Sequence, residues 1–326
     1  MGERDTAMNQ WLCDKARFAD LFNGSVFGGE QVVRPEELER IDSVSQTLLT
    51  DKKGNKENVK RYRDVVMQWR GKTDLAILAC ETQDSIHYAM PVRAMIYDGL
   101  SYMEQIKIIK KENVEKKSLE PGNEFLTGLR KENRLHPVGT IVLYYGEEPW
   151  DGSRNLHELL EFPKDEKERQ LLESLIPDYH INLIEADKIE KLKYYKTDLQ
   201  LIFGLLQCKK DKQKFQNYIM EHEEYFQNLE VETYEAVRVM LNSKTKMKKI
   251  KAANAKGRVD MCQAITEIFE DGVSQGISQG ISQGISQVIA MCQEFGISME
   301  ETIARIMEKQ SVSAEQAQEY VQKYWK

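Results

Sequence analysis

The sequence predicts an α/β core, in which helices flank a mixed sheet, followed by an α-helical C-terminal region. Short β-branched and apolar runs alternate with helical patterns in the first part of the chain, which is the element order of an α/β protein. Beyond residue 188 the pattern is helical and rich in charge, and a four-residue repeat occupies part of the tail. We therefore expect three regions, 1–185, 186–260 and 261–326.

The bulk composition is that of a globular protein, with 41% hydrophobic and 30% charged residues. No apolar run approaches the roughly 20 residues that cross a bilayer, and the first residues lack the apolar segment of a secretory signal, so we expect a cytoplasmic protein without membrane spans. Five dispersed cysteines without a CxxC pair argue against disulfides and structural zinc. The net charge of -7 argues against simple coating of nucleic acid, but is compatible with a metal-dependent enzyme.

Local signals predict the first elements. A helix over 14–22 is expected to end at Asn23-Gly24, a common C-terminal signal. A helical turn at 35–38 should lead to a strand over 45–49 and a charged turn over 51–55.

A hairpin is predicted next. Its strands span 62–69 and 74–83, and the turn-forming residues 70–73 separate them. The apolar run over 75–80 indicates burial on both faces, so the second strand should belong to the core of the sheet.

A long helix should follow the hairpin. Pro91 suits its first turn, and the helical pattern continues to about residue 110. Its buried stripe is predicted to be Met95, Ile96, Leu100 and Met103. Further strands are expected over 138–145 and 181–184, with a loop around Trp150 and a helix between them.

The tail contains four copies of a Gly-Ile-Ser-Gln repeat over 272–287, the first with valine in place of isoleucine. In a helix, a period of four aligns the glycines in one drifting stripe and the aliphatic residues in the next, so two backbones could approach closely. Each interior glycine costs about 1 kcal/mol relative to alanine, so an isolated helix would be weak. Either the segment pairs with a partner helix, which implies a homo-oligomer, or it is a flexible spacer.

Two acids could meet within the hairpin. Strand alternation puts Glu81 and Gln83 on one face. A turn that pairs Gly71 with Asp74 places Asp64 opposite Glu81, and a turn shifted by one residue leaves them diagonal neighbours. Carboxylates about 5 Å apart repel by roughly 3 kcal/mol at an effective dielectric near 20, which favours a cation between them. Oxygen ligands suit Mg²⁺ or Mn²⁺, although spacing alone is equally compatible with ordinary acids at strand ends.

A wider set of motifs surrounds these acids. In chain order they are RYRDV at 61–65, ACETQ at 79–83, IHYAMPVR at 86–93, MIYD at 95–98, and LYYG at 143–146 with WDG at 150–152. Together they resemble the successive motifs of the PD-(D/E)XK nuclease-like family, whose members include recombination-promoting nucleases and transposases. The resemblance covers about residues 61–160 and implies a restriction-endonuclease-like core.

The resemblance implies roles for individual residues. Asp64 and Glu81 would hold the metal, and Gln83 would stand where many relatives have lysine. Glutamine can only orient a water by neutral hydrogen bonds, so this departure puts full activity in doubt. Asp20, in the first predicted helix, is a candidate for the family's N-terminal acidic position and thus for a third metal ligand. It could equally be a solvated helix acid.

Candidate substrate contacts lie nearby and in the helical region. Arg93 and Tyr97 are one helical turn apart and could face a phosphate beside the metal, although Arg93 could instead pair with Glu81. A basic run contains no acid and could contact the DNA backbone, or simply form a solvated helix face. It comprises Lys244, Lys246, Lys248, Lys249, Lys251, Lys256 and Arg258.

The leading hypothesis is a metal-dependent DNA endonuclease, with recombination or mobile-element biology as the role that the resemblance implies. The alternative is a catalytically weak nuclease-fold protein that acts as an oligomeric nucleic-acid binding or interaction module. A third possibility, a helical scaffold assembled through the repeat, predicts self-association without dependence on divalent metal. Convergence of Asp64, Glu81 and Gln83 in space would favour the first.

Overall fold

The computed structural model describes residues 3–41, 44–50, 56–62, 64–70, 75–241, 247, 257–310 and 312–325. The chain divides into two compact units. The first contains the described residues up to 241 together with 257–259, and the second contains residue 247 and those from 260 onward. The sheet therefore belongs to the first unit, and the four-residue repeat to the second.

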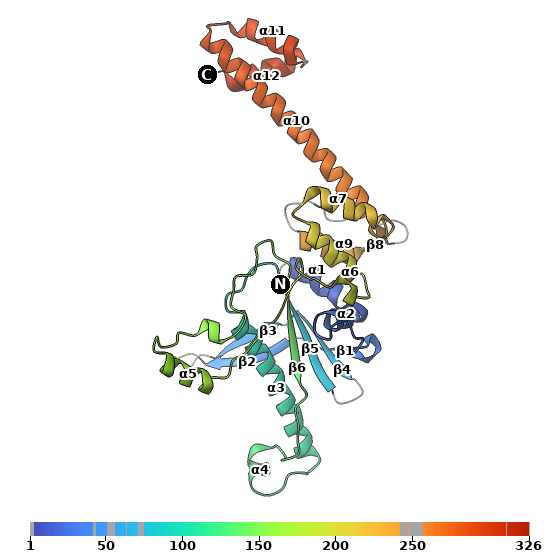
Figure 1. Cartoon of the computed structure of the whole chain (residues 1–326), viewed down its shortest axis with the longest axis vertical. Helices are drawn as coiled ribbons and strands as arrows, with labels where there is room; N and C mark the ends of the chain where they lie inside the picture. Colours follow the sequence, from blue (N-terminus) through green and yellow to red (C-terminus); the bar gives the residue numbers. More distant parts are fainter. Residues whose placement is uncertain are drawn as a thin grey trace. The chain divides into compact units, whose positions relative to one another are not determined.

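A five-stranded mixed sheet forms the centre of the first unit (Figure 1). Its strands, in spatial order, are β1 (Leu38–Arg40), β4 (Val65–Arg70), β5 (Leu75–Gln83), β6 (Val138–Tyr144) and β7 (Asn182–Glu185). The pairs β1–β4 and β4–β5 are antiparallel, whereas β5–β6 and β6–β7 are parallel. The predicted α/β class with a mixed sheet is confirmed, and β5 is the central strand.

Two further strands, β2 (Val44–Thr50) and β3 (Lys56–Tyr62), pair only with each other in the described structure and form an antiparallel ribbon. Figure 1 draws this ribbon to one side of the five-stranded sheet. The strand predicted over 45–49 is confirmed as β2. The charged turn predicted over 51–55 lies outside the described residues.

The strand predicted over 62–69 is wrong at its start. Tyr62 ends β3, and the central sheet is entered only at Val65. The sequence of β3, KENVKRY, alternates poorly in hydrophobicity, so a half-buried strand could not be predicted from it.

The helix α3 (Met90–Glu115) packs against β6 and confirms the long helix predicted after Pro91. Its predicted buried stripe is wrong, because Met95 and Met103 are exposed, Met103 by 53%. Polar contacts with the sheet determine which face of α3 is buried. Asp98 on that face accepts a hydrogen bond from the Thr140 hydroxyl at 2.6 Å. The buried residues of α3 are Met90, Pro91, Ala94, Tyr97, Asp98, Gln105 and Asn113.

The N-terminal helices α1 (Glu3–Leu12) and α2 (Lys15–Ser25) pack with helices from much later in the chain. These are α6 (Leu199–Cys208), which contacts α2, and α9 (Val231–Leu241), which contacts α1. Arg17 of α2 donates to the Asp198 carboxylate at 2.9 Å. The helices predicted over 186–260 as a separate appendage thus lie in the same unit as the sheet.

The helix predicted over 14–22 is confirmed, but α2 continues through Asn23-Gly24. The Asn23 amide bonds the backbone of Val32 and Val33, so its polar atoms are used without ending the helix. Gly24 is required by packing, since an added Cβ would lie 2.5 Å from the Tyr195 ring.

The remaining elements of the first unit are short. They are η1 (Pro35–Glu37), α4 (Asn123–Thr127), η2 (His157–Leu159), α5 (Glu166–Leu175), η3 (Leu192–Tyr194), α7 (Lys212–Glu221), α8 (Glu223–Phe226), β8 (Leu229–Glu230) and β9 (Arg258–Val259). The turn predicted at 35–38 and the helix predicted after Trp150 are confirmed by η1 and α5.

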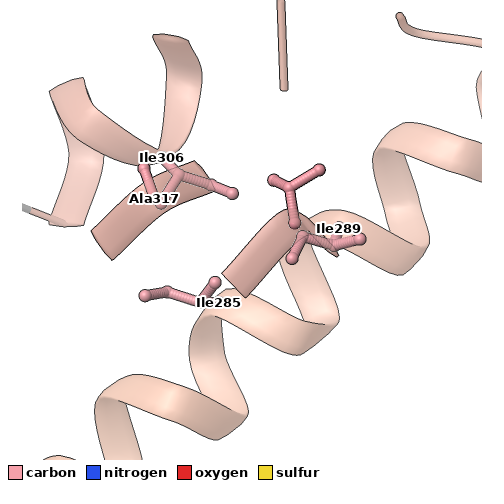
Figure 2. Packing of buried hydrophobic residues seen from close by; sticks show 5 residues of the cluster. Ile285, Ile289, Ile306 and Ala317 are labelled. Atoms are coloured by element: carbon pink, nitrogen blue, oxygen red, sulfur yellow. The ribbon is translucent and has the colours of Figure 1, made fainter. Parts of the chain in front are cut away.

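The second unit consists of α10 (Met261–Glu294), α11 (Met299–Gln310) and α12 (Ala314–Tyr324). The four-residue repeat lies within the single helix α10, so the helical interpretation of the repeat is confirmed. Figure 2 shows Ile285 and Ile289 of α10 packed with Ile306 of α11 and Ala317 of α12. Within the described residues no helix is long and apolar enough to cross a membrane.

Candidate active site

The hairpin register agrees with the first of the two predicted alternatives. In the β4–β5 ladder Val65 pairs with Cys80 and Arg70 pairs with Leu75, which places Asp64 opposite Glu81 when the ladder is extended by one position. Asp64 itself lies in a bend just before β4. Its carboxylate accepts hydrogen bonds from the Thr82 backbone N–H at 2.7 Å and from the Thr82 hydroxyl at 3.1 Å. Asp64 is therefore fixed to the end of the central strand.

Glu81 is fully buried on β5 and is paired with an arginine. Its Oε2 lies 3.3 Å from Nη2 of Arg93, and its side chain has 0% exposure against 29% for Arg93. The Arg93 guanidinium lies 5.5 Å from the centroid of the Tyr97 ring. The alternative in which Arg93 pairs with Glu81 is thus realised in the structure.

The electrostatics of Arg93 connect it to both acids. Burial alone would lower the pKa of Arg93, but the charges of Glu81 and Asp64, with Tyr97, raise it overall. The four predicted residues Asp64, Glu81, Arg93 and Tyr97 therefore belong to one electrostatic group. Burial, reinforced by Asp64 and Glu81, also raises the pKa of Cys80, so this thiol stays neutral beside the acids.

Gln83 occupies the end of β5, two residues beyond Glu81 and on the same face. Its backbone carbonyl accepts a hydrogen bond from the Tyr145 N–H at 3.0 Å, which ties this end of β5 to the chain just after β6. The Gln83 side chain is half-buried. The sequence therefore placed this residue correctly, and its catalytic role stays a prediction.

Asp20 has a different environment. Its carboxylate accepts hydrogen bonds from the Lys196 N–H at 2.8 Å, the Thr197 N–H at 2.7 Å and the Thr197 hydroxyl at 2.6 Å. These bonds hold the turn before α6 against α2. No group of three or more histidine, cysteine, aspartate or glutamate side chains arranged to hold a metal occurs among the described residues, so Asp20 does not join Asp64 and Glu81 in such a group.

Sequence reasoning missed the buried support behind Arg93 and Tyr97. The next residue of α3, Asp98, accepts hydrogen bonds from the hydroxyls of Thr140 and Tyr179, each at 2.6 Å. Thr140 lies on β6, and Tyr179 precedes β7, so a single carboxylate anchors α3 to the parallel half of the sheet. No periodic signal in the sequence distinguishes Asp98 from a solvated helix acid.

The basic run lies mostly outside the described residues, which include none of its lysines. Arg258 is described, in β9, where its guanidinium lies 3.4 Å from the Glu230 carboxylate. This ion pair gives Arg258 a structural partner. The role of the run in binding DNA stays a prediction.

The donor set suits a hard, partly hydrated cation. Asp64 and Glu81 supply two carboxylates, and magnesium is usually held by one or two carboxylates while it keeps several waters and binds substrate phosphates. The same pair would not make a closed structural metal site, which needs more protein ligands. Because Glu81 is also paired with Arg93, a bound Mg²⁺ or Mn²⁺ at these two carboxylates stays a prediction.

The first unit is therefore an α/β protein whose central strand carries a buried glutamate paired with an arginine, and Asp64 is hydrogen-bonded to the next residue of that strand. Comparisons of this chain with known protein families, with curated proteins and with solved structures find no match.

Proposed function

We propose that this chain is a divalent-metal-dependent endonuclease of the PD-(D/E)XK type that hydrolyses phosphodiester bonds of DNA. The observation that supports it most is the register of β4 and β5, which brings Asp64 to the position opposite Glu81 on the central strand. The motif resemblance and the mixed sheet agree with this assignment. A role in recombination or in mobile elements is part of the same proposal.

The two acids and Gln83 have distinct roles in it. Asp64 and Glu81 would hold Mg²⁺ or Mn²⁺, which when bound lowers the pKa of a coordinated water and neutralises charge on the phosphate. Gln83, on the same face as Glu81, would orient the attacking water through neutral hydrogen bonds. The bond from Thr82 to Asp64 holds one carboxylate at a fixed place for this purpose.

Arg93 and Tyr97 would contact the substrate. A guanidinium has five N–H donors and binds phosphate through pairs of them. The Nε of Arg93 is buried without a hydrogen-bond partner among the described residues. A turn of this side chain toward a phosphate would exchange its bond with Glu81 for charge-assisted bonds.

One observation favours a second function. The ion pair between Arg93 and Glu81 already supplies a positive charge to the buried acid, and Gln83 replaces the lysine of many relatives. The second candidate is a catalytically weak nuclease-fold protein that binds nucleic acid or assembles into oligomers. In such a protein the ion pair would be permanent, and Arg93 and Glu81 would only stabilise the fold.

Cleavage of supercoiled plasmid tests the two functions. Purified wild type, Asp64→Ala and Glu81→Ala would be compared in Mg²⁺, in Mn²⁺ and in chelator, with Glu104→Ala, an exposed acid on α3, as the matched control. We expect metal-dependent cleavage by wild type and the control and none by the two site variants. Equal cleavage by all four would assign the activity elsewhere, and no cleavage of any DNA form would favour the weak nuclease-fold protein.

A further inference from the structure

A hydrogen-bonded arm extends from the first unit at the far end of α3, where Figure 1 shows α4. It comprises the end of α3, the helix α4 and the chain on either side of it, residues 107–134. The buried Asn113 amide of α3 donates to the Gly128 carbonyl at 3.0 Å and to the Asn133 side chain at 2.9 Å. These bonds fix the returning chain to α3, so the arm has a defined shape.

The helix α4 of the arm carries two exposed apolar side chains. Phe125 is 74% exposed and Leu126 is 82% exposed. Gly122 and Gly128, with φ of 99° and 71°, flank this helix in backbone conformations that other residues rarely adopt. Adjacent large apolar side chains on a preformed loop mark an interaction site, because little conformational entropy is lost when such a loop binds.

The helix α5 presents a second apolar surface. None of its ten residues is buried in the described structure. Leu171 and Leu175, one turn apart, are 62% and 74% exposed, and with the exposed Leu172 they form the leucine face. A helix of ten residues is marginal in water, since most helical stability in proteins comes from packing of an apolar face. Another surface that covers the leucine face would therefore stabilise α5.

The arm and the surroundings of the leucine face have opposite charge. The arm contains eight lysines and arginines against five glutamates, whereas residues 158–175, which include α5, contain six acids against three lysines and arginines. Glu168 lies three residues before Leu171 and therefore on the same side of α5. In the arm, the backbone N–H of the exposed Lys131 donates to the Glu124 carboxylate of α4 at 3.1 Å, so this lysine lies next to the apolar pair.

We propose that the arm of one copy of this chain binds the leucine face of a second copy. Phe125 and Leu126 pack against the three leucines, and the basic residues of the arm face the acids around α5. Figure 1 shows α4 and α5 at separate places in the first unit, so the two surfaces are apart within one chain. Because the contact uses different surfaces on the two copies, it joins chains head to tail, into a ring or an open series. The proposal does not depend on the proposed nuclease function.

Sedimentation velocity of the full chain over a range of concentrations would measure this assembly. The arm variant is Phe125→Ala/Leu126→Ala, and the face variant is Leu171→Ala/Leu175→Ala, since alanine retains helix propensity. The control is Met220→Ala, an exposed apolar residue of α7 outside both surfaces. Thermal unfolding of each variant checks that the fold is intact.

We expect the mass of wild type and of the control to rise with concentration. Each variant alone should lose at least about tenfold in association affinity. An equimolar mixture of the two should form a dimer and nothing larger, because the intact arm of the face variant binds the intact leucine face of the arm variant, and both remaining surfaces are disabled. Added salt should weaken assembly, since the surfaces have opposite charge.

A wild type that stays monomeric would overturn the proposal, as would loss of assembly in only one variant or a mixture that stays monomeric. Assembly that both variants retain, but that Gly→Ala at Gly280 and Gly284 abolishes, would assign self-association to the repeat instead. A monomeric wild type whose affinity for duplex DNA falls in the arm variant would identify DNA as the partner of the arm, and would equally overturn the proposal.

Discussion

Nη2 of Arg93, on helix α3, lies 3.3 Å from Oε2 of Glu81, on the central strand. The Glu81 side chain has no exposed surface. A buried carboxylate that loses its cationic partner is costly, because neither water nor another charge replaces the interaction. This contact therefore connects the stability of the sheet with the chemistry proposed for it.

Arg93→Met should lower the free energy of unfolding by about 3 kcal/mol. Adding Glu81→Gln to this variant should restore much of the loss, since the buried charge is then absent. Urea unfolding of both single variants and the double variant measures the coupling. Arg169→Met, in an exposed pair with Glu173 on α5, serves as the control and should change stability by less than about 1 kcal/mol. Additive effects of Arg93→Met and Glu81→Gln would contradict the expectation.

Gln83→Ala should retain metal binding and cut DNA at least about tenfold more slowly, because no side chain remains to orient the water. Gln83→Lys should keep or raise the activity by supplying a positive charge. Single-turnover cleavage measures the rates, and calorimetric Mn²⁺ titration measures the binding. The control is Gln170→Ala, on exposed α5. An unchanged rate for Gln83→Ala would remove this residue from the site.

Glu185 at the end of β7 should make stability depend on acidic pH. Burial opposes ionisation, but hydrogen bonds from Lys188 and the Trp150 N–H, with Arg154, lower the pKa of Glu185 overall. A lowered pKa stabilises the fold above the ordinary value near 4.5, and this contribution is lost as pH falls through the folded-state pKa.

Glu185→Gln should therefore be about 1–2 kcal/mol less stable than wild type at pH 7, with the difference shrinking below about pH 4.5. Thermal and urea unfolding across pH 3–7 would measure it. A difference that is the same at every pH would show that packing, and not the charge, is responsible.

The glycines of α10 give a test of self-association. An added Cβ at Gly280 or Gly284 meets open space in the described chain, so Gly→Ala at both should stabilise the helix by about 1 kcal/mol each. If these glycines let a second copy approach, the same change should lower the particle mass in light scattering while raising the melting temperature. A monomer mass for both wild type and the double Gly→Ala variant would contradict self-association through the repeat.

Part of the aliphatic stripe of the repeat packs within its own chain. Ile285 is buried, and Ile281 is partly buried, against α11 and α12 of the same chain. These positions are therefore used within the second unit. Contact with a partner copy through Ile281 or Ile285 would therefore compete with this packing.

The sequence predicted what depends on local alternation and turn length. The β4–β5 register is one of the two that the turn allowed, and the apolar run of β5 predicted that this strand is buried on both faces. The buried face of α3 could not be predicted, because Asp98 and its two hydroxyl partners outweigh the methionines that hydrophobicity selects. The ion pair of Arg93 with Glu81 was one of two predicted alternatives, and only coordinates distinguish them.

The bonds of Asp20 have a consequence for biosynthesis. The backbone N–H groups that donate to this carboxylate lie 176 and 177 residues later in the chain. Helix α1 packs against α9, which ends at Leu241, so α1 cannot make this contact before α9 has been synthesised. During translation the N-terminal helices must therefore remain without these partners until residue 241 has left the ribosome. Contacts this distant slow folding and expose apolar surface in the nascent chain. A fragment ending at residue 185 would keep that exposure permanently, and the full first unit should be the smallest soluble piece that contains the site.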